Sequence, residues 1–115
     1  MQITERTIQD VVILDLNGKL TLGAGADLLR DKLTNVVAQG HSKVLLNLAG
    51  VPYVDSGGLG ELVRCSMAAQ KANGAVKLVG LTTRITDLLA ITKLLNVFET
   101  FETEQEAIAS YMAPA

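Results

Sequence analysis

The residues best suited to chemistry lie in one short stretch, Asp55-Ser56-Gly57-Gly58, between an apolar run and an amphipathic pattern. The pattern predicts that Ser56 lies at or next to the start of a helix, where unpaired backbone N–H groups and a partial positive charge gather. A phosphate on the Ser56 hydroxyl would be favourably placed there, and the two glycines would leave the hydroxyl open to another protein. The same residues also suit an ordinary helix cap in a glycine-rich turn. On spacing alone, the cap is the simpler interpretation.

Two other residue types that often carry chemistry occur once each, as His41 and Cys65. A serine-histidine-acid catalytic set requires a histidine beside its nucleophile, and we interpret His41 as a residue of a surface loop. We interpret Cys65 as a semi-buried, unreactive thiol in a helix, with redox sensing as the minor alternative. One cysteine and one histidine cannot build a zinc site. We therefore predict no catalytic residue, no metal and no cofactor, and a chain that is not an enzyme.

A second glycine-rich segment, Gly23-Ala24-Gly25, follows a predicted strand and precedes a helix. This arrangement is superficially similar to a dinucleotide-binding loop. The third glycine of that pattern is missing because Leu28 occupies its position, and Asn47 stands where an acidic residue would bind the ribose. We predict a flexible turn and a helix cap here.

The overall composition is typical of a globular chain with one domain over residues 1–115. Hydrophobic residues make up 49% and charged residues 19% of the 115 residues, which is enough apolar surface to fold around one core without disulfides. A net charge of −2 and an aromatic content of 3% disfavour nucleic-acid binding, which needs clustered Lys and Arg. No apolar stretch approaches the roughly 20 residues that span a bilayer. We expect a cytoplasmic protein that does not bind membranes and is a monomer or a weak dimer.

Hydrophobic periodicity predicts strands and helices in alternation along the chain. The predicted strands cover 3–8, 11–16, 43–48, 76–80 and 97–101, and the predicted helices cover 24–39 and 56–72 and begin again near 82 and 103. The order β-β-α-β-α-β-α-β-α starts with a hairpin and then favours parallel strands with right-handed crossovers. The expected fold class is therefore α/β, with one mixed sheet that carries about four helices.

Some details of these helices are specific enough to test. In the helix over 56–72, the positions that we assign to one inner face are Leu59, Leu62, Val63, Ser66, Met67 and Gln70. Thr82 or Thr83 can cap the third helix. Thr103 followed by Glu106 is a capping-box pattern for the last helix, in which we expect Ala107, Ile108 and Tyr111 to pack inward.

The stretch Tyr53-Val54-Asp55-Ser56-Gly57-Gly58-Leu59-Gly60 resembles the signature loop of STAS domains, a family named after sulfate transporters and anti-sigma factor antagonists. The family pattern is Asp-Ser, then Ser or Thr, then Gly-Leu-Gly. The resemblance covers almost the whole chain. It extends to the turn Gly18-Lys19-Leu20, the strand over 44–48, the helix exit over 88–94 and the segment Val97-Phe98 with the acidic helix that follows.

The resemblance implies a bacterial anti-sigma factor antagonist that works by partner switching. In such a protein the unphosphorylated form binds an anti-sigma factor and frees the sigma factor. The anti-sigma factor is a serine kinase that phosphorylates the serine after the loop aspartate, which is Ser56 by position, and a serine phosphatase reverses the reaction. The residues that the resemblance assigns to partner binding are Asp55, Gly57, Gly58, Leu59, Gly60 and Thr21.

The chain departs from the family pattern at several positions near this loop. Gly57 stands where Ser or Thr is usual, which removes a second hydroxyl and can loosen the helix start. Thr21 stands where many members have Asp, and Lys19 takes an acidic position. An alternative within the family is a scaffolding subunit of a stress-signalling or lipid-transport complex. Some of those subunits carry Thr or no phosphoacceptor in the loop, so Ser56 favours the antagonist.

Overall fold

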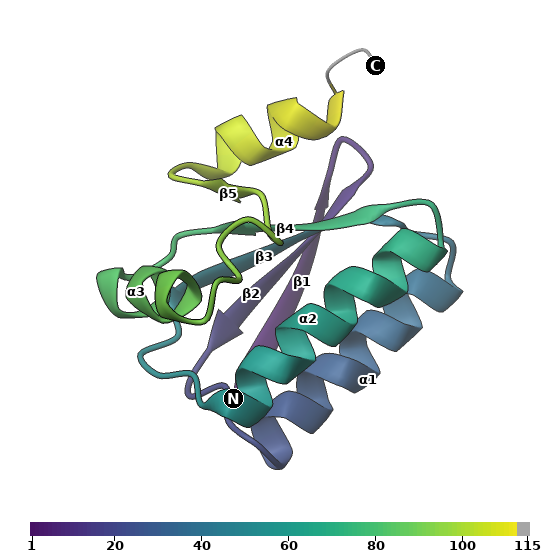
Figure 1. Ribbon diagram of the computed structural model, residues 1–115. Coiled ribbons are helices and arrows are strands. Elements are labelled where there is room, and N and C mark those ends of the chain that lie inside the picture. The colour runs from purple at the N-terminus through teal and green to yellow at the C-terminus, as the bar shows by residue number, and fades with distance from the viewer. Residues whose placement is uncertain (113–115) are drawn as a thin grey trace.

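Strands and helices alternate in the order that the sequence predicts. A computed structural model describes residues 1–112 of the chain. Its elements are β1 (Gln2–Ile8), β2 (Val11–Asn17), α1 (Ala24–Ala38), β3 (Lys43–Gly50), α2 (Ser56–Lys71), β4 (Ala75–Val79), α3 (Thr83–Ile91), β5 (Thr100–Phe101) and α4 (Glu104–Met112) (Figure 1). The predicted α/β fold class is confirmed.

All five strands form one mixed sheet in the order β1-β2-β3-β4-β5. β1 and β2 form an antiparallel hairpin. Its turn residues Gln9 and Asp10 have positive φ angles of 50° and 69°, as in the two-residue turns that match the twist of paired strands. The neighbouring pairs from β2 to β5 are parallel. Parallel neighbours need long crossovers, which α1, α2 and α3 supply.

Strands β2 and β3 are buried on both faces, which explains their continuous apolar runs. One face packs against α1, α2 and α3 and holds the main core, which includes Leu14, Leu46 and Leu78. The opposite face is covered by α4 (Figure 1). There a smaller cluster forms from Val11, Ile13, Leu45, Val79, Ala107 and Ile108.

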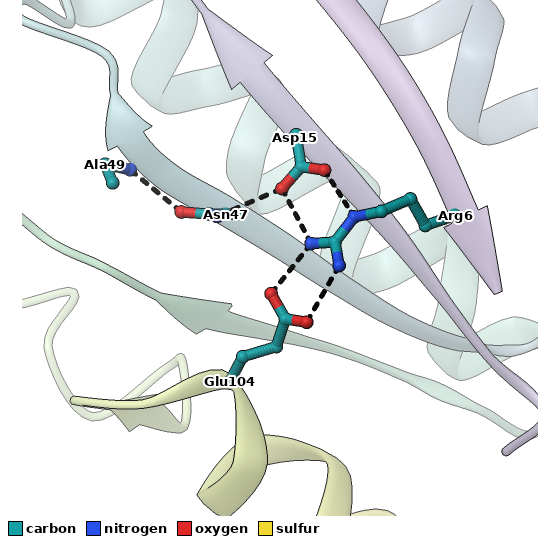
Figure 2. A network of polar contacts seen from close by, with 5 residues as sticks. All are labelled: Arg6, Asp15, Asn47, Ala49 and Glu104. Atoms are coloured by element: carbon teal, nitrogen blue, oxygen red, sulfur yellow. Dashed lines mark hydrogen bonds and ion pairs between the residues drawn. The ribbon is translucent and has the colours of Figure 1, made fainter. Parts of the chain in front are cut away.

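A polar network joins β1, β2, β3 and α4 beside this smaller cluster (Figure 2). The Arg6 guanidinium donates to Asp15 at 2.7 and 3.0 Å and to Glu104 at 2.9 and 2.7 Å. The Asn47 amide donates to Asp15 at 3.0 Å, and its oxygen accepts from the Ala49 backbone N–H. Hydrogen bonds from Arg6 hold the pKa of Asp15 below its usual value, and the carboxylates of Glu104 and Asp15 raise the pKa of Arg6. The network therefore ties the first turn of α4 to the sheet.

The inner face of α2 differs from the predicted one. Met67 is 54% exposed and Gln70 is also exposed, whereas Glu61 and Cys65 are buried. The prediction was right for Leu59, Leu62 and Ser66, which are buried, and wrong for Met67 and Gln70, because it did not include Glu61 in the inner face. In the fold this carboxylate is paired with two arginines, so it occupies an inward position and the helix turns Met67 toward solvent.

The last strand is shorter than predicted. Only Thr100 and Phe101 pair with β4, and residues 95–97 form a turn. The alternation over 97–101 arises because Phe98 is buried in the main core while Phe101 packs against the smaller cluster. The two phenylalanines pack on different cores, and their spacing therefore produces an alternating apolar pattern like that of a strand.

Two helix caps predicted from local patterns are present. The Thr82 hydroxyl accepts from the Ile85 N–H at 3.3 Å at the start of α3. The Thr103 hydroxyl accepts from the Glu106 N–H at 3.2 Å and donates to the Glu106 carboxylate at 2.9 Å. Within residues 1–112, no helix has both the length and the apolar character needed to cross a membrane.

Candidate functional site

The candidate site lies where two loops meet at the carboxyl ends of β2 and β3. The loop after β2 and the loop after β3 form a parallel bridge between Leu20 and Val54. The Leu20 N–H donates to the Tyr53 carbonyl at 3.0 Å, and the Asp55 N–H donates to the Leu20 carbonyl at 3.3 Å. These bonds continue the pairing of β2 and β3 beyond the strands. They bring the start of α2 to the loop that leads into α1, and the two helices run side by side (Figure 1).

Asp55 is the N-cap of α2 and also binds the neighbouring loop. Its backbone is extended, and its Oδ1 atom accepts from the Gly58 N–H at 2.8 Å. Both carboxylate oxygens also lie 3.0 Å from the Leu22 backbone nitrogen, which donates to them. The N–H groups of Gly58 and Leu22 lower the pKa of Asp55. One charged carboxylate therefore joins the helix start to the loop after β2.

Two glycines in the first turn of α2 allow the loops to come this close. A Cβ atom on Gly57 would lie 2.5 Å from the Leu22 Cβ and 2.9 Å from the Leu22 Cα. A Cβ atom on Gly58 would overlap the carbonyl oxygen of Leu20. Gly60, in contrast, faces open space. Gly57 and Gly58 are thus needed for packing against the loop after β2, in addition to any access that they give to Ser56.

The structure separates the residues that the sequence assigned to the site into two groups. Ser56 is the first residue of α2 and is exposed. The exposed or partly exposed residues beside it are Gly60, Asp55, Gly57 and Thr21, whereas Gly58 and Leu59 are buried. The two buried residues thus shape the loop from beneath, and the exposed group forms the accessible surface.

Large apolar side chains are exposed on the adjoining loops and on α3. Leu22 is 78% exposed, Tyr53 is 43% exposed and Ile91 is 80% exposed. Tyr53 and Ile91 line a groove of about 500 Å³ between the loop after β3 and α3. The sequence analysis did not select Leu22. The available signal is a single leucine between Thr21 and Gly23, in a turn outside the periodic segments.

His41 lies far from Ser56, so the two residues cannot form a catalytic pair. His41 precedes β3 and Ser56 follows it, and β3 has 8 residues. At a rise of about 3.3 Å per residue, the strand alone separates its first and last residues by roughly 23 Å. Residues 1–112 also contain no group of three or more His, Cys, Asp or Glu side chains that could hold a metal ion.

Cys65 and Glu61 form a buried polar pair on α2. Cys65 is fully buried, more so than predicted, and burial raises the pKa of its thiol. Its Sγ atom donates to the Glu61 carboxylate at 3.4 Å. Glu61 also accepts from Arg30 of α1 at 3.0 Å and from Arg64 at 2.7 Å. The sequence analysis missed this arrangement, which links α1 to α2 and leaves the thiol in its unreactive form.

Comparison with known proteins agrees with this fold. The family model "STAS domain" matches residues 2–107. A protein of Thermotoga neapolitana named as a homolog of a "putative anti-sigma factor antagonist" is 28% identical over 103 residues, which cover 90% of this chain and 91% of the relative. A crystal structure of a "putative anti-sigma factor antagonist" from Thermotoga maritima has a TM-score of 0.90 and 25% identity, and covers 96% of this chain and 95% of that one.

The fold is also similar to that of the anti-sigma factor antagonist SpoIIAA. Its unphosphorylated form has a TM-score of 0.76 at 17% identity and covers 98% of this chain and 100% of SpoIIAA. The phosphorylated Bacillus form has a TM-score of 0.74 at 19% identity and covers 96% of this chain and 99% of SpoIIAA. At these identities the likeness concerns the fold. Because the family model spans almost the whole described chain, this protein belongs to the STAS domain family.

Proposed function

We propose that this chain is a cytoplasmic anti-sigma factor antagonist whose unphosphorylated form binds an anti-sigma factor serine kinase. Phosphorylation of Ser56 ends that binding, and a serine phosphatase restores it. The observation that carries the proposal is the exposure of Ser56 at the start of α2. Of the four serines in the chain, Ser66 is buried and Ser42 and Ser110 are partly buried. Ser56 is thus the most exposed of the four serines.

The proposed contact surface is the exposed part of the two loops. It consists of Ser56, Gly57, Gly60 and Thr21, with Asp55 holding the loops together through the Leu22 and Gly58 N–H groups. Gly60 presents no side chain, so a partner backbone can approach the first turn of α2. The buried Gly58 and Leu59 support this surface from below.

Charge explains how one phosphate can switch binding. The N–H groups at the start of α2 already face the Asp55 carboxylate, so a phosphate on Ser56 finds fewer free donors than a bare helix start would offer. The modification adds a charge of about −1.5 to −2 beside an existing carboxylate. An interface that fits a neutral hydroxyl would then enclose an unpaired dianion. A loss of about 2.8 kcal/mol weakens a complex roughly 100-fold, and one unpaired charge in an interface can cost this much.

The proposed switch is local. Both the unphosphorylated and the phosphorylated form of SpoIIAA have the fold of this chain, with TM-scores of 0.76 and 0.74. A switch of this kind needs no rearrangement of the sheet or of the helices, since the charge acts at the contact surface itself.

The test is phosphorylation of the purified chain by the host's candidate anti-sigma factor kinases with ATP, followed by mass spectrometry. We expect a single phosphate on Ser56, none on Ser56→Ala, and unchanged phosphorylation of the control Ser42→Ala at the opposite end of β3. Binding should weaken about 100-fold on phosphorylation, and a serine phosphatase should restore it. Equal binding of the phosphorylated and unmodified chains would refute the switch. No phosphate from any candidate kinase, with stable binding to a transporter or scaffold, would favour the scaffolding alternative.

A further inference from the structure

We infer that Leu22 is an apolar anchor for the anti-sigma factor that this chain binds, and that Gly57 lacks a side chain because the Cα and Cβ atoms of Leu22 occupy the space. The inference rests on the proposed function, since it concerns the recognition of that partner. It adds a contact residue that the signature loop does not contain, and it explains why Gly57 replaces the usual Ser or Thr.

Leu22 combines high exposure with a fixed backbone. The residue is 78% exposed, so burial in the core does not account for it. Its N–H donates to both oxygens of the Asp55 carboxylate at 3.0 Å. The flanking Thr21 carbonyl accepts from the Ala26 N–H at 3.0 Å. Because the backbone of this loop is already fixed, a partner that buries Leu22 does not have to order the loop, which suits an interface anchor.

Leu22 lies directly beside the candidate phosphoacceptor. The Asp55 carboxylate that binds its N–H precedes Ser56 in the chain, and Gly57, which its side chain contacts, follows Ser56. A partner that covers the Ser56 hydroxyl must therefore also cover Leu22. The partner should therefore have an apolar recess that receives Leu22. Next to that recess it should have a surface that accepts the neutral Ser56 hydroxyl and excludes a phosphate dianion.

A side chain at position 57 would compete with the Cα and Cβ atoms of Leu22 for one volume. A Cβ atom on Gly57 would meet the Leu22 Cβ at 2.5 Å and the Leu22 Cα at 2.9 Å. Because a backbone atom is involved, rotation of the leucine side chain alone cannot relieve the overlap. With this backbone geometry, a side chain that carries a hydroxyl at position 57 and Leu22 in its present place exclude each other. A partner adapted to Ser or Thr at 57 would meet an apolar surface here instead.

The experiment measures the affinity of the anti-sigma factor that phosphorylates the wild-type chain. The variants are Leu22→Ala, Gly57→Ser, their double variant and the control Met67→Ala. Met67 is 54% exposed on the solvent side of α2 and lies eleven residues beyond Ser56, about 16 Å along the helix. We expect Leu22→Ala to weaken binding at least tenfold and Met67→Ala to change it less than twofold.

Thermal unfolding of the same variants tests the pairing of the two positions. Gly57→Ser should lower both the melting temperature and the affinity, because the loop after β2 must move. The double variant should regain neither the melting temperature nor the affinity, because alanine at position 22 keeps the Cβ and Cα atoms that a side chain on residue 57 would meet. Circular dichroism of each variant separates a change at the contact surface from loss of the fold.

The outcomes distinguish this inference from the proposed function. If the wild-type chain is phosphorylated at Ser56 but Leu22→Ala binds with unchanged affinity, the role of Leu22 is refuted and the proposed function stands. If Gly57→Ser alters neither melting temperature nor affinity, the competition for volume is refuted. If no anti-sigma factor binds the wild-type chain, both the proposed function and this inference fall.

Discussion

The two faces of the sheet are covered by different amounts of structure and held by different forces. The face toward α1, α2 and α3 carries the main core and the candidate site at its edge. The face toward α4 has a cluster of six buried residues. The difference teaches that apolar burial is the main force that holds α1, α2 and α3 to the first face. The attachment of α4 to the second face also depends on a few polar anchors. Segments with few apolar contacts open first, so we expect α4 to be the least stable helix.

Three anchors hold α4 to the sheet. Glu104 in its first turn accepts from Arg6 at 2.9 and 2.7 Å. Near its end, the Tyr111 hydroxyl lies 2.6 Å from the Val44 carbonyl and 2.8 Å from the Ala75 carbonyl, and it can donate to one of them at a time. Ser110 accepts from the buried Lys77 at 2.8 Å, whose ammonium also lies 4.2 Å from the centre of the Tyr111 ring.

The largest expected effect comes from two adjacent leucines that point to opposite faces. Leu45 and Leu46 are both fully buried in β3, Leu45 in the α4 cluster and Leu46 in the main core. Leu46→Ala should destabilise the fold by about 4 kcal/mol and Leu45→Ala by about 2 kcal/mol. The cavity at Leu45 can be partly closed by a shift of the single helix α4. Urea denaturation measures both, and a larger loss from Leu45→Ala would contradict the comparison.

The next effect concerns the hydroxyl of Tyr111. Tyr111→Phe removes one hydrogen bond to the sheet, so the free energy of unfolding should fall by about 1 kcal/mol. Amide hydrogen exchange should accelerate in α4 and remain unchanged in α2. Equal acceleration in both helices would show that α4 does not open independently.

A smaller loss is expected from the ion pairs in Figure 2. The side chains of Arg6 and Glu104 are 39% and 30% exposed, so solvent screens them. Glu104→Gln should lower the free energy of unfolding by less than about 1 kcal/mol, and added salt should shrink the difference. Lys19→Ala, at an exposed lysine after β2, serves as the control for a general charge effect. A difference that is independent of salt would show that packing, not charge, explains the loss.

The smallest expected effect is a pH dependence carried by Asp15. Its pKa is lower in the folded chain, chiefly because Arg6 donates hydrogen bonds to it. Its stabilisation is therefore complete above the unfolded pKa of about 3.9 and is lost as the pH falls through the lower folded value. Unfolding measured from pH 6 to pH 3 should show a smaller acid loss in Asp15→Asn than in the wild-type chain. Identical pH profiles would exclude Asp15 as a source of the acid sensitivity.

Features encoded by neighbouring residues were predicted from the sequence. The hairpin turn, the Thr82 cap and the Thr103–Glu106 cap each depend on residues within four positions of one another. The inward face of α2 was predicted only in part, because the position of Glu61 depends on Arg30 from another helix. The length of β5 was not predicted either, because Phe98 and Phe101 pack against different cores.

The candidate site shows the same division. The sequence by itself determined that a helix starts at or next to Ser56, with Asp55 or Ser56 as its cap, since this follows from residue types within one turn. Only the tertiary structure decided that Leu22, 33 residues away, binds the Asp55 carboxylate and lies against Gly57. That meeting depends on the parallel pairing of β2 with β3, which sets two loops side by side, and no local pattern in either loop specifies its partner.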